Sequence, residues 1–274
     1  MPEKTSYVLG ESNRAAQRLD IQDRHFAEPS EWLLNQLPIL PGDRVVELGC
    51  GPGGFTRRIL QRLGGDGIVV GVDTTAGLLD QAVANLSNFG PAKFQPVLAD
   101  IGQLGDWLEG ADVVVGRAVL HHLPMAEYLL GKLLHRLRPG TRIGFIEPDF
   151  RTPLVRLACL EAAGQPELVP LRIWSTALNQ LYQARQISPA VGATLAPAIE
   201  VAGYRQIQSR WTPFPTDGPM IENMAMFYDE VRLRLEALHL LTSDEVNAQQ
   251  VLLRNLPPGP HPATWGVHAV VAKV

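Results

Sequence analysis

Acidic side chains recur at the ends of apolar runs in the first half of the chain. Glu47 follows Val45-Val46 and stands two residues before the glycine-rich segment Gly49-Cys50-Gly51-Pro52-Gly53. A carboxylate there can accept a hydrogen bond from a cationic ammonium group, and glycine lets the backbone approach a ligand closely. A helix that begins near Gly53 would offer unpaired N–H groups to an anionic group such as a carboxylate or phosphate. These residues together predict a site for a nucleoside-bearing cofactor.

Three more apolar runs end in polar side chains. Asp73 follows residues 68–72, Asp100 follows residues 94–98, and Arg117 follows residues 112–116. Asp73 and Asp100 could simply cap the helices that come next. An unpaired Glu47 on a buried strand would be costly, which favours a ligand-binding role for that acid.

Strand and helix patterns alternate between residues 45 and 148. Five apolar runs, the last at 142–146, are separated by helical patterns such as Phe55, Ile59 and Leu63, or Leu79, Ala82, Val83 and Leu86. This alternation predicts an α/β fold with a parallel sheet and helices on both faces. Ligands bind at the carboxyl ends of the strands in such sheets. The polar residues at the strand ends are therefore expected to converge.

The chain divides by pattern into four parts. We expect an N-terminal helical arm at 1–40, with a helix over 11–22, and a cofactor-binding core at 41–150. A helical lid at 151–189 and a C-terminal part of the core at 190–274 follow. The last part includes strands near 204–212 and 265–272 and a helical cap insertion at about 217–256. In that insertion an apolar stripe from Met220 to Leu238 predicts an amphipathic helix, and Thr242 with Glu245 predicts a capping box.

The glycine loop alone allows two kinds of cofactor. Gly49, Gly51 and Gly54 satisfy the GxGxxG pattern of dinucleotide-binding proteins, which is weak by itself. However, Glu47 would repel a pyrophosphate, and Pro52 removes an N–H group that a pyrophosphate loop would offer. A nicotinamide-dependent oxidoreductase is thus the weaker alternative. Such an enzyme would share the glycine loop but would not need Asp100.

The segment Glu47-Leu48-Gly49-Cys50-Gly51-Pro52-Gly53 resembles motif I of class I S-adenosylmethionine-dependent methyltransferases. Residues 120–123, Leu-His-His-Leu, resemble the small-molecule branch related to ubiquinone and menaquinone biosynthesis methyltransferases, of methyltransferase type 11/25. The resemblance implies a Rossmann-like, doubly wound, seven-stranded sheet that is mostly parallel, with the last strand antiparallel and helical cap insertions. It covers residues 7–148 well and residues 190–274 only in outline.

The resemblance also assigns residues to the cofactor, S-adenosyl-L-methionine, which would leave as S-adenosyl-L-homocysteine. The glycine loop would wrap the methionine part, Asp73 would accept the ribose hydroxyls, and Asp100 would bind the adenine amino group. The expected cofactor-binding residues are Tyr7, Glu47, Gly49, Cys50, Gly51, Gly53, Asp73, Thr74, Asp100, Ile101 and Arg117. Cys50 is interpreted as a small loop residue and not as a nucleophile.

Methyl transfer to a small-molecule acceptor is the expected reaction. The sulfonium already carries a good leaving group, so the enzyme must mainly align a nucleophile with the S–CH3 bond. Oxygen is the expected acceptor atom and carbon the next, with nitrogen and sulfur open. His121 or His122 could serve as a base, although structural support of the loop competes with that role. Glu147, Asp149 and Trp174 are candidate substrate-binding residues.

Composition sets the outer limits on function. The chain is 46% hydrophobic and 19% charged with a net charge of −4, and it has no lysine- or arginine-rich run for nucleic-acid phosphates. Its two cysteines lack metal-site spacing, so no metal is expected. The absence of an apolar signal segment or a membrane span favours a cytoplasmic enzyme. A homodimer is compatible with the sequence, and so is a protein that binds S-adenosylmethionine without transferring its methyl group.

Overall fold

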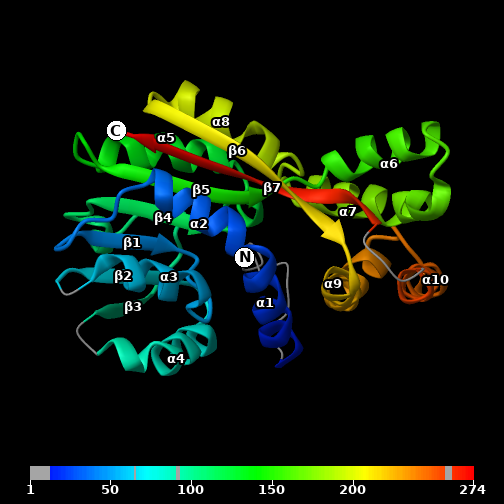
Figure 1. The fold of residues 1–274 in the computed structure, drawn as a ribbon, viewed down its shortest axis with the longest axis horizontal. Coiled ribbons are helices and arrows are strands. Elements are labelled where there is room, and N and C mark those ends of the chain that lie inside the picture. The colour runs from blue at the N-terminus through cyan, green and yellow to red at the C-terminus, as the bar shows by residue number, and fades with distance from the viewer. Residues whose placement is uncertain (1–12, 65, 91–92, 257–260) are drawn as a thin grey trace. The chain divides into compact units, whose positions relative to one another are not determined.

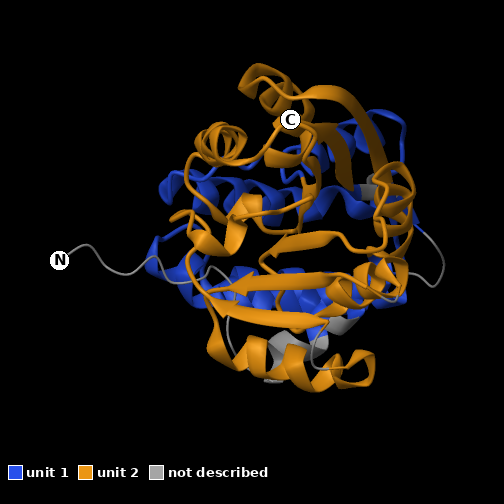
Figure 2. Ribbon diagram, turned by 90° about the vertical axis from the view of Figure 1, so that its left-hand side faces the viewer, with its two compact units in different colours: residues 1–25, 149–190, 213–266 blue, residues 26–148, 191–212, 267–274 orange. Residues whose placement is uncertain are grey.

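The computed structural model describes residues 13–64, 66–90, 93–256 and 261–274. The chain forms two compact units, which are coloured separately in Figure 2. Unit 1 comprises residues 1–25, 149–190 and 213–266, and unit 2 comprises residues 26–148, 191–212 and 267–274. The segment expected as an N-terminal arm, residues 1–40, is divided between the two units, since 1–25 belong to unit 1 and 26–40 to unit 2.

Unit 2 is built on a seven-stranded sheet with the order β3-β2-β1-β4-β5-β7-β6 (Figure 1). β1 to β5 pair in parallel, and β7 pairs antiparallel with β5. The predicted Rossmann-like sheet is therefore confirmed. The strands are β1 (Arg44–Leu48), β2 (Ile68–Asp73), β3 (Phe94–Leu98), β4 (Val113–Arg117), β5 (Arg142–Pro148), β6 (Arg205–Thr216) and β7 (His261–Lys273).

The central strands are apolar because both of their faces are covered. Val45, Val46 and Leu48 of β1 are fully buried, and so are the three successive valines 113–115 of β4. Continuous burial of this kind is typical of parallel strands that lie between two helical layers. The helices of this unit are α2 (Ala27–Gln36), α3 (Gly54–Leu63), α4 (Ala76–Asn85), α5 (Ala126–Arg136) and α8 (Val191–Ala202).

The two faces of the sheet carry different helices. Ile143 and Phe145 of β5 belong to the apolar cluster that includes α5 and α8. Gly144, between them, faces the opposite side of the sheet, where Leu33 of α2 and Leu37, the residue after α2, lie against it. One predicted core position is wrong: Val83 on α4 is 48% exposed, because α4 packs on the sheet through Leu79 and Ala82 instead.

Unit 1 is mainly helical in the described residues. Its helices are α1 (Asn13–His25), α6 (Thr152–Ala162), α7 (Arg172–Ala184), α9 (Gly218–Ala237) and α10 (Ser243–Arg254). The predicted stripe on α9 is buried from Met220 to Leu235, whereas Leu238 lies beyond the helix end and is 45% exposed. The capping box of Thr242 and Glu245 is confirmed at the start of α10.

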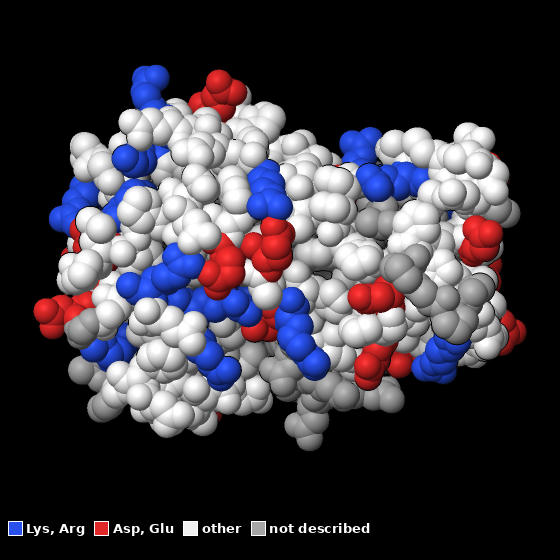
Figure 3. Space-filling model, in the orientation of Figure 1, with Lys and Arg blue, Asp and Glu red and all other residues white. Residues whose placement is uncertain are grey.

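Charged side chains of both signs are mixed on the surface of unit 2 around α2 and α3 (Figure 3). There Glu31 pairs with Arg58 and Arg62, and Glu28 pairs with Arg210. Exposed pairs of this kind contribute little to stability but keep a surface hydrated. None of the helices in the described part of the chain combines the length and the apolar character that a bilayer-spanning helix requires.

The close approach of α8 to β5 depends on Gly192. A Cβ atom added there would lie 2.6 Å from the backbone oxygen of Glu147 and 2.8 Å from the backbone of Pro148. We expect Gly192→Ala to lower the free energy of unfolding by about 1–3 kcal/mol through overpacking. Urea denaturation would measure the change.

Gly131 in α5 is the matched control, because a Cβ atom there meets nothing within 4 Å. Gly131→Ala should raise the free energy of unfolding by about 0.5–1 kcal/mol, since alanine is the better helix former. Equal effects of the two substitutions would contradict the close packing of α8 on β5.

Candidate functional site

The strand order of unit 2 gathers the predicted polar residues at one edge of the sheet. Asp73 and Arg117 end β2 and β4, Glu47 lies one residue before the end of β1, and Asp100 follows β3 by two residues. Since β3, β2, β1 and β4 are adjacent and parallel, these side chains lie at neighbouring strand ends. The strand order also reverses between β1 and β4, where ligands bind in open α/β sheets.

Glu47 is held by a residue that the sequence interpretation missed. Its side chain is 1% exposed, and its Oε2 atom accepts a hydrogen bond of 2.6 Å from the hydroxyl of Thr56. Thr56 lies in the first turn of α3 and is itself fully buried. The sequence did contain a signal for this contact, because Thr56 is a polar residue on the apolar face of a predicted helix. The bond fixes the carboxylate of Glu47 at the mouth of the glycine loop.

The glycines of the loop adopt backbone conformations that other residues avoid. Gly49, Gly51 and Gly53 have φ angles of +67°, +51° and +87°. A Cβ atom at Gly49 would also lie 2.5 Å from a methyl group of Val119, whereas one at Gly51 would meet nothing within 4 Å. The loop is thus packed against the protein at Gly49 and open at Gly51.

Asp73 ties the loop to the end of β2. Its Oδ2 atom accepts a hydrogen bond of 3.0 Å from the Gly51 N–H, and its Oδ1 atom accepts one of 2.9 Å from the Thr75 N–H. Burial raises the pKa of the Asp73 carboxyl, and these backbone N–H groups, with that of Thr74, offset part of the rise. Thr74 itself is exposed in the turn that follows.

The remaining loop and strand-end residues differ in exposure. Asp100 is exposed and accepts a hydrogen bond from the Gly102 N–H, while Ile101 is buried. Cys50 is 4% exposed, and burial, followed by the charges of Glu47 and Asp73, raises the pKa of its thiol well above the ordinary value. The interpretation of Cys50 as a small loop residue stays a prediction. No metal-binding cluster occurs among the residues that the structure describes.

Arg117 lies between two aromatic rings. Its guanidinium carbon is 5.6 Å from the ring centre of Phe26 and 5.1 Å from that of Phe55, and Nη1 donates to the hydroxyl of Ser30. Cation–π contacts with both rings hold the guanidinium in one orientation at the end of β4. Its positive charge is therefore fixed at the end of β4.

Glu147 organises the loop after β4 from inside unit 2. Its side chain is fully buried, and its two oxygens accept hydrogen bonds of 3.0, 2.9 and 3.2 Å from the N–H groups of Val119, Leu120 and His121. The Nδ1 atom of His121 lies 2.8 Å from Oε2 of the same carboxylate. Burial raises the pKa of Glu147 to about 7, although the three backbone N–H groups favour the ionised form.

The two adjacent histidines have different environments. His121 is 4% exposed, whereas His122 is half-buried, and their rings lie 3.8 Å apart between centroids. Glu147 thus orients the imidazole of His121 through Nδ1. Nδ1 is therefore the protonated atom whenever Glu147 is ionised and His121 is neutral.

The predicted substrate-binding residues all make contacts within the protein. The carboxylate of Glu147 is occupied as described above, and that of Asp149 accepts hydrogen bonds from the Arg151 and Thr152 N–H groups at the start of α6. Trp174 is 3% exposed and stacks on Tyr228 at 3.5 Å between centroids. Their role in substrate binding stays a prediction. Tyr7, expected to cover the cofactor, lies outside the described residues.

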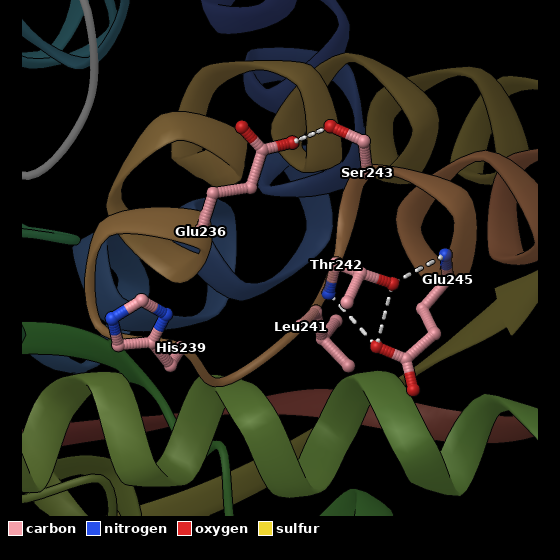
Figure 4. A pocket seen from close by; sticks show the side chains of 6 residues that line it. All are labelled: Glu236, His239, Leu241, Thr242, Ser243 and Glu245. Atoms are coloured by element: carbon pink, nitrogen blue, oxygen red, sulfur yellow. Dashed lines mark hydrogen bonds between the residues drawn. The ribbon is translucent and has the colours of Figure 1, made fainter.

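Unit 1 has a surface pocket where α9 is followed by α10 (Figure 4). Glu236 accepts a hydrogen bond from Ser243 there, and Glu245 forms the capping box with Thr242. Both carboxylates thus bind residues at the start of α10. Neither is buried in the way that Glu47 and Glu147 are, so the pocket shows no sign of a ligand-binding role. The pocket is lined by Glu236, His239, Leu241, Thr242, Ser243 and Glu245.

Comparison with known proteins identifies the core. Residues 46–143 match the family described as "Methyltransferase domain". This stretch is therefore similar to a methyltransferase domain. It runs from β1 into β5 and includes the glycine loop, Asp73, Asp100 and Arg117. The resemblance drawn from the sequence is therefore confirmed for this domain.

Relatives and solved structures are similar over different lengths. Trans-aconitate 2-methyltransferase of Rhizobium leguminosarum is 32% identical over 181 residues, which is 65% of this chain and 64% of that relative. A geranyl diphosphate methyltransferase solved with S-adenosylmethionine superposes with a TM-score of 0.55 and 16% identity, covering 97% of both chains. The [4+2]-cyclase SpnF superposes with a TM-score of 0.54 and 13% identity, covering 90% of this chain and 78% of its own. The two structural similarities show the fold.

The raised pKa of Glu147 makes a testable contribution to stability. Because its folded-state pKa of about 7 exceeds the ordinary value of 4.5, the stability it contributes is fully present below pH 4.5 and is lost as pH rises through 7. We expect the unfolding free energy of the wild type to fall by about 3 kcal/mol relative to Glu147→Gln over that range. Urea denaturation at several pH values would measure the difference.

Glu245→Gln is the control, because hydrogen bonds from Thr242 lower the pKa of Glu245. Glutamine preserves the capping box, so this variant should track the wild type between pH 5 and 8. A constant difference between wild type and Glu147→Gln over that range would contradict the raised pKa.

Proposed function

We propose that this protein transfers the methyl group of S-adenosyl-L-methionine to a small-molecule acceptor. The observation that carries the proposal is the row of acids Glu47, Asp73 and Asp100 at the adjacent ends of β1, β2 and β3, beside a glycine loop of positive φ. In that order they suit the amino group, the ribose and the adenine of one nucleoside. The match of residues 46–143 to a methyltransferase domain supports the assignment.

The glycine loop has room for the cofactor on one side. Gly51 has open space where a side chain would stand, while Gly49 is packed against Val119. The methionine part would lie along the open side, where the buried carboxylate of Glu47 can accept a hydrogen bond from its ammonium group. Asp73 accepts hydrogen bonds from the Gly51 and Thr75 N–H groups. Its two carboxylate oxygens can also accept hydrogen bonds from the ribose hydroxyls. Arg117 would complement the carboxylate of the cofactor.

When bound, the cofactor supplies an electrophilic methyl group on a cationic sulfur. The residues of this chain then need only hold the acceptor in line with the S–CH3 bond at roughly 3–3.5 Å and exclude water. Fixed acids such as Glu47, which is oriented by Thr56, act without reorganisation during the reaction.

The acceptor atom that we propose is an oxygen of a carboxylate. The relative from Rhizobium leguminosarum is named for trans-aconitate, which carries carboxylates and offers oxygen nucleophiles. A carboxylate is ionised at neutral pH, since its unperturbed pKa is about 4, and it needs no base to become a nucleophile. On this proposal the Glu147–His121 pair holds the loop after β4 in place.

The Glu147–His121 pair also favours a second candidate, methyl transfer to a hydroxyl group. A hydroxyl acceptor must lose a proton, and a histidine oriented by a carboxylate on Nδ1 is suited to take it at Nε2. Of the two predicted catalytic histidines, His121 is the candidate base in this arrangement, because Glu147 orients its ring.

A fold of this kind does not by itself establish methyl transfer. The [4+2]-cyclase SpnF shares the fold, so binding of the cofactor without transfer remains an alternative. Nicotinamide binding is a further alternative, and Glu47 at the mouth of the loop disfavours it because a carboxylate repels a pyrophosphate. Formation of S-adenosyl-L-homocysteine separates methyl transfer from both alternatives.

We expect S-adenosyl-L-homocysteine to form when the protein is incubated with S-adenosyl-L-methionine and trans-aconitate or a similar polycarboxylic acid. Mass spectrometry of both products would measure the reaction. Asp73→Asn should raise the KM for S-adenosyl-L-methionine at least tenfold by weakening the ribose contact, whereas Asp80→Asn on the exposed surface of α4 should not. Cofactor binding without product from either acids or alcohols would contradict methyl transfer.

The two acceptor types give opposite results for His121→Asn. Asparagine keeps a donor toward Glu147 but cannot act as a base, so with a carboxylate acceptor kcat should stay within about threefold and be independent of pH from 6 to 8. With a hydroxyl acceptor, kcat should fall by a factor on the order of 10²–10⁴. His135→Asn, at an exposed position in α5, is the control. A large loss with a carboxylic acid would overturn the carboxylate proposal in favour of base catalysis.

A further inference from the structure

Thr56 is a polar residue on an otherwise apolar face of α3. Its side chain is fully buried, and the same helix also buries Phe55, Ile59 and Leu63. Threonine stabilises a helix poorly in such a position, because it is β-branched and its hydroxyl must leave water. A valine of nearly the same shape would fill the space without the hydroxyl. Packing alone therefore does not explain a threonine here.

The hydroxyl of Thr56 donates its one hydrogen to the carboxylate of Glu47 on β1. The bond reaches Oε2 over 2.6 Å, and both side chains are buried. Val46 and Leu48, on either side of Glu47, belong to the apolar cluster that includes α5 and α8. Because side chains alternate along a strand, Glu47 faces the opposite side of the sheet and meets Thr56 there.

Glu47 and Thr56 form a polar pair that the core of unit 2 does not need for its stability. Two apolar residues of the same shape can replace a buried hydrogen-bonded pair with little loss, whereas a buried carboxylate is costly. The pair does fix the direction of the carboxylate, because a β-branched side chain in a helix has few rotamers. A fixed direction is useful to a group that binds a ligand.

The pair lies where β1 passes into the glycine loop. Glu47 stands two residues before Gly49. Thr56 follows Gly53 by three residues, so the two side chains flank the loop in the sequence. Open space lies where Gly51 would carry a side chain. An amino group that lies along this loop would meet a carboxylate that is already oriented, and so would bind without reordering a buried charge.

We propose that Thr56 is a positioning residue that makes the site select nucleosides with a free amino group. Its hydroxyl holds the carboxylate of Glu47 in the direction from which that carboxylate accepts hydrogen bonds from the ammonium group of the cofactor. Thr56 thus acts through Glu47. The inference rests on the proposed function in taking S-adenosyl-L-methionine as the cofactor. A nucleoside without the amino group would lose this contact and keep those of its ribose and adenine.

Isothermal titration of the full chain with S-adenosyl-L-homocysteine and with its deamino analogue tests the role. The analogue keeps the carboxylate, the ribose and the adenine and lacks only the amino group. The wild type should bind S-adenosyl-L-homocysteine more tightly than the analogue by a factor on the order of ten or more, because a hydrogen bond to a charged group is lost. This factor is the selectivity for the amino group.

Thr56→Val removes the hydroxyl at nearly constant shape and should reduce the selectivity to about threefold or less, since Glu47 loses its orientation. Thr56→Ala, which adds no methyl group beside the carboxylate, should give the same result and serves if the valine variant does not fold. Thr56→Ser keeps the hydroxyl and should keep the selectivity of the wild type. Adding Thr56→Val to Glu47→Gln should cause no further loss of selectivity, because the two residues act as a unit.

Thr141→Val is the matched control. Thr141 is also buried in unit 2, and its hydroxyl donates to the backbone oxygen of Ala111 at 3.2 Å. It stands one residue before β5, at the amino-terminal ends of the parallel strands, whereas Glu47 lies near the carboxyl end of β1. We expect this variant to lose stability and to keep the selectivity of the wild type.

Wild-type selectivity in Thr56→Val and Thr56→Ala would overturn the inference, and so would an equal loss of selectivity in Thr141→Val. Either result would make Thr56 a packing residue. Equal affinity of the wild type for the two nucleosides would also overturn it, because Glu47 would then not bind the amino group. Failure of the proposed function is distinguishable, since the wild type would then bind neither nucleoside, or would bind both without transferring a methyl group from S-adenosyl-L-methionine.

Discussion

The backbone hydrogen bonds between parallel strands are the constraint on which the rest of the site depends. Their register sets Glu47 opposite Gly71 of β2 and Val115 of β4, and sets Asp73 opposite Leu98 of β3. A slip of one residue would turn each side chain to the other face of the sheet. The valines of β1 and β4 are all buried, which anchors both strands in the apolar core. The apolar core thus decides where the polar groups stand.

The acids at the strand ends differ in how strongly the protein holds them. Glu47 is fixed by Thr56 and Asp73 by two backbone N–H groups, whereas Asp100 is exposed in its turn. This gradient suits a nucleoside whose charged end must be oriented firmly and whose base is read at the surface. Glu147, by contrast, uses its oxygens entirely within the loop after β4, and so acts through His121 and the backbone.

The sequence predicted the features that local patterns determine. The strands follow from apolar runs, the glycine loop from its spacing, and the capping box of α10 from Thr242 and Glu245. Side-chain contacts between elements were not predictable: Thr56 binds Glu47 from the next helix, and Arg18 binds Glu230 over a separation of 212 residues. Val83 was misplaced because α4 is short and packs through a narrower face than its composition indicates. The spacing of apolar residues predicts which face of a helix is buried. How much of that face is covered depends on the strand or helix that packs against it.

A crystal structure with S-adenosyl-L-homocysteine tests the central claim most directly. We expect the ribose hydroxyls to contact Asp73, the adenine to lie beside Asp100 and Ile101, and the amino acid part to run along the glycine loop toward Glu47. A nucleoside bound at any other edge of the sheet, or with its ribose away from Asp73, would contradict it.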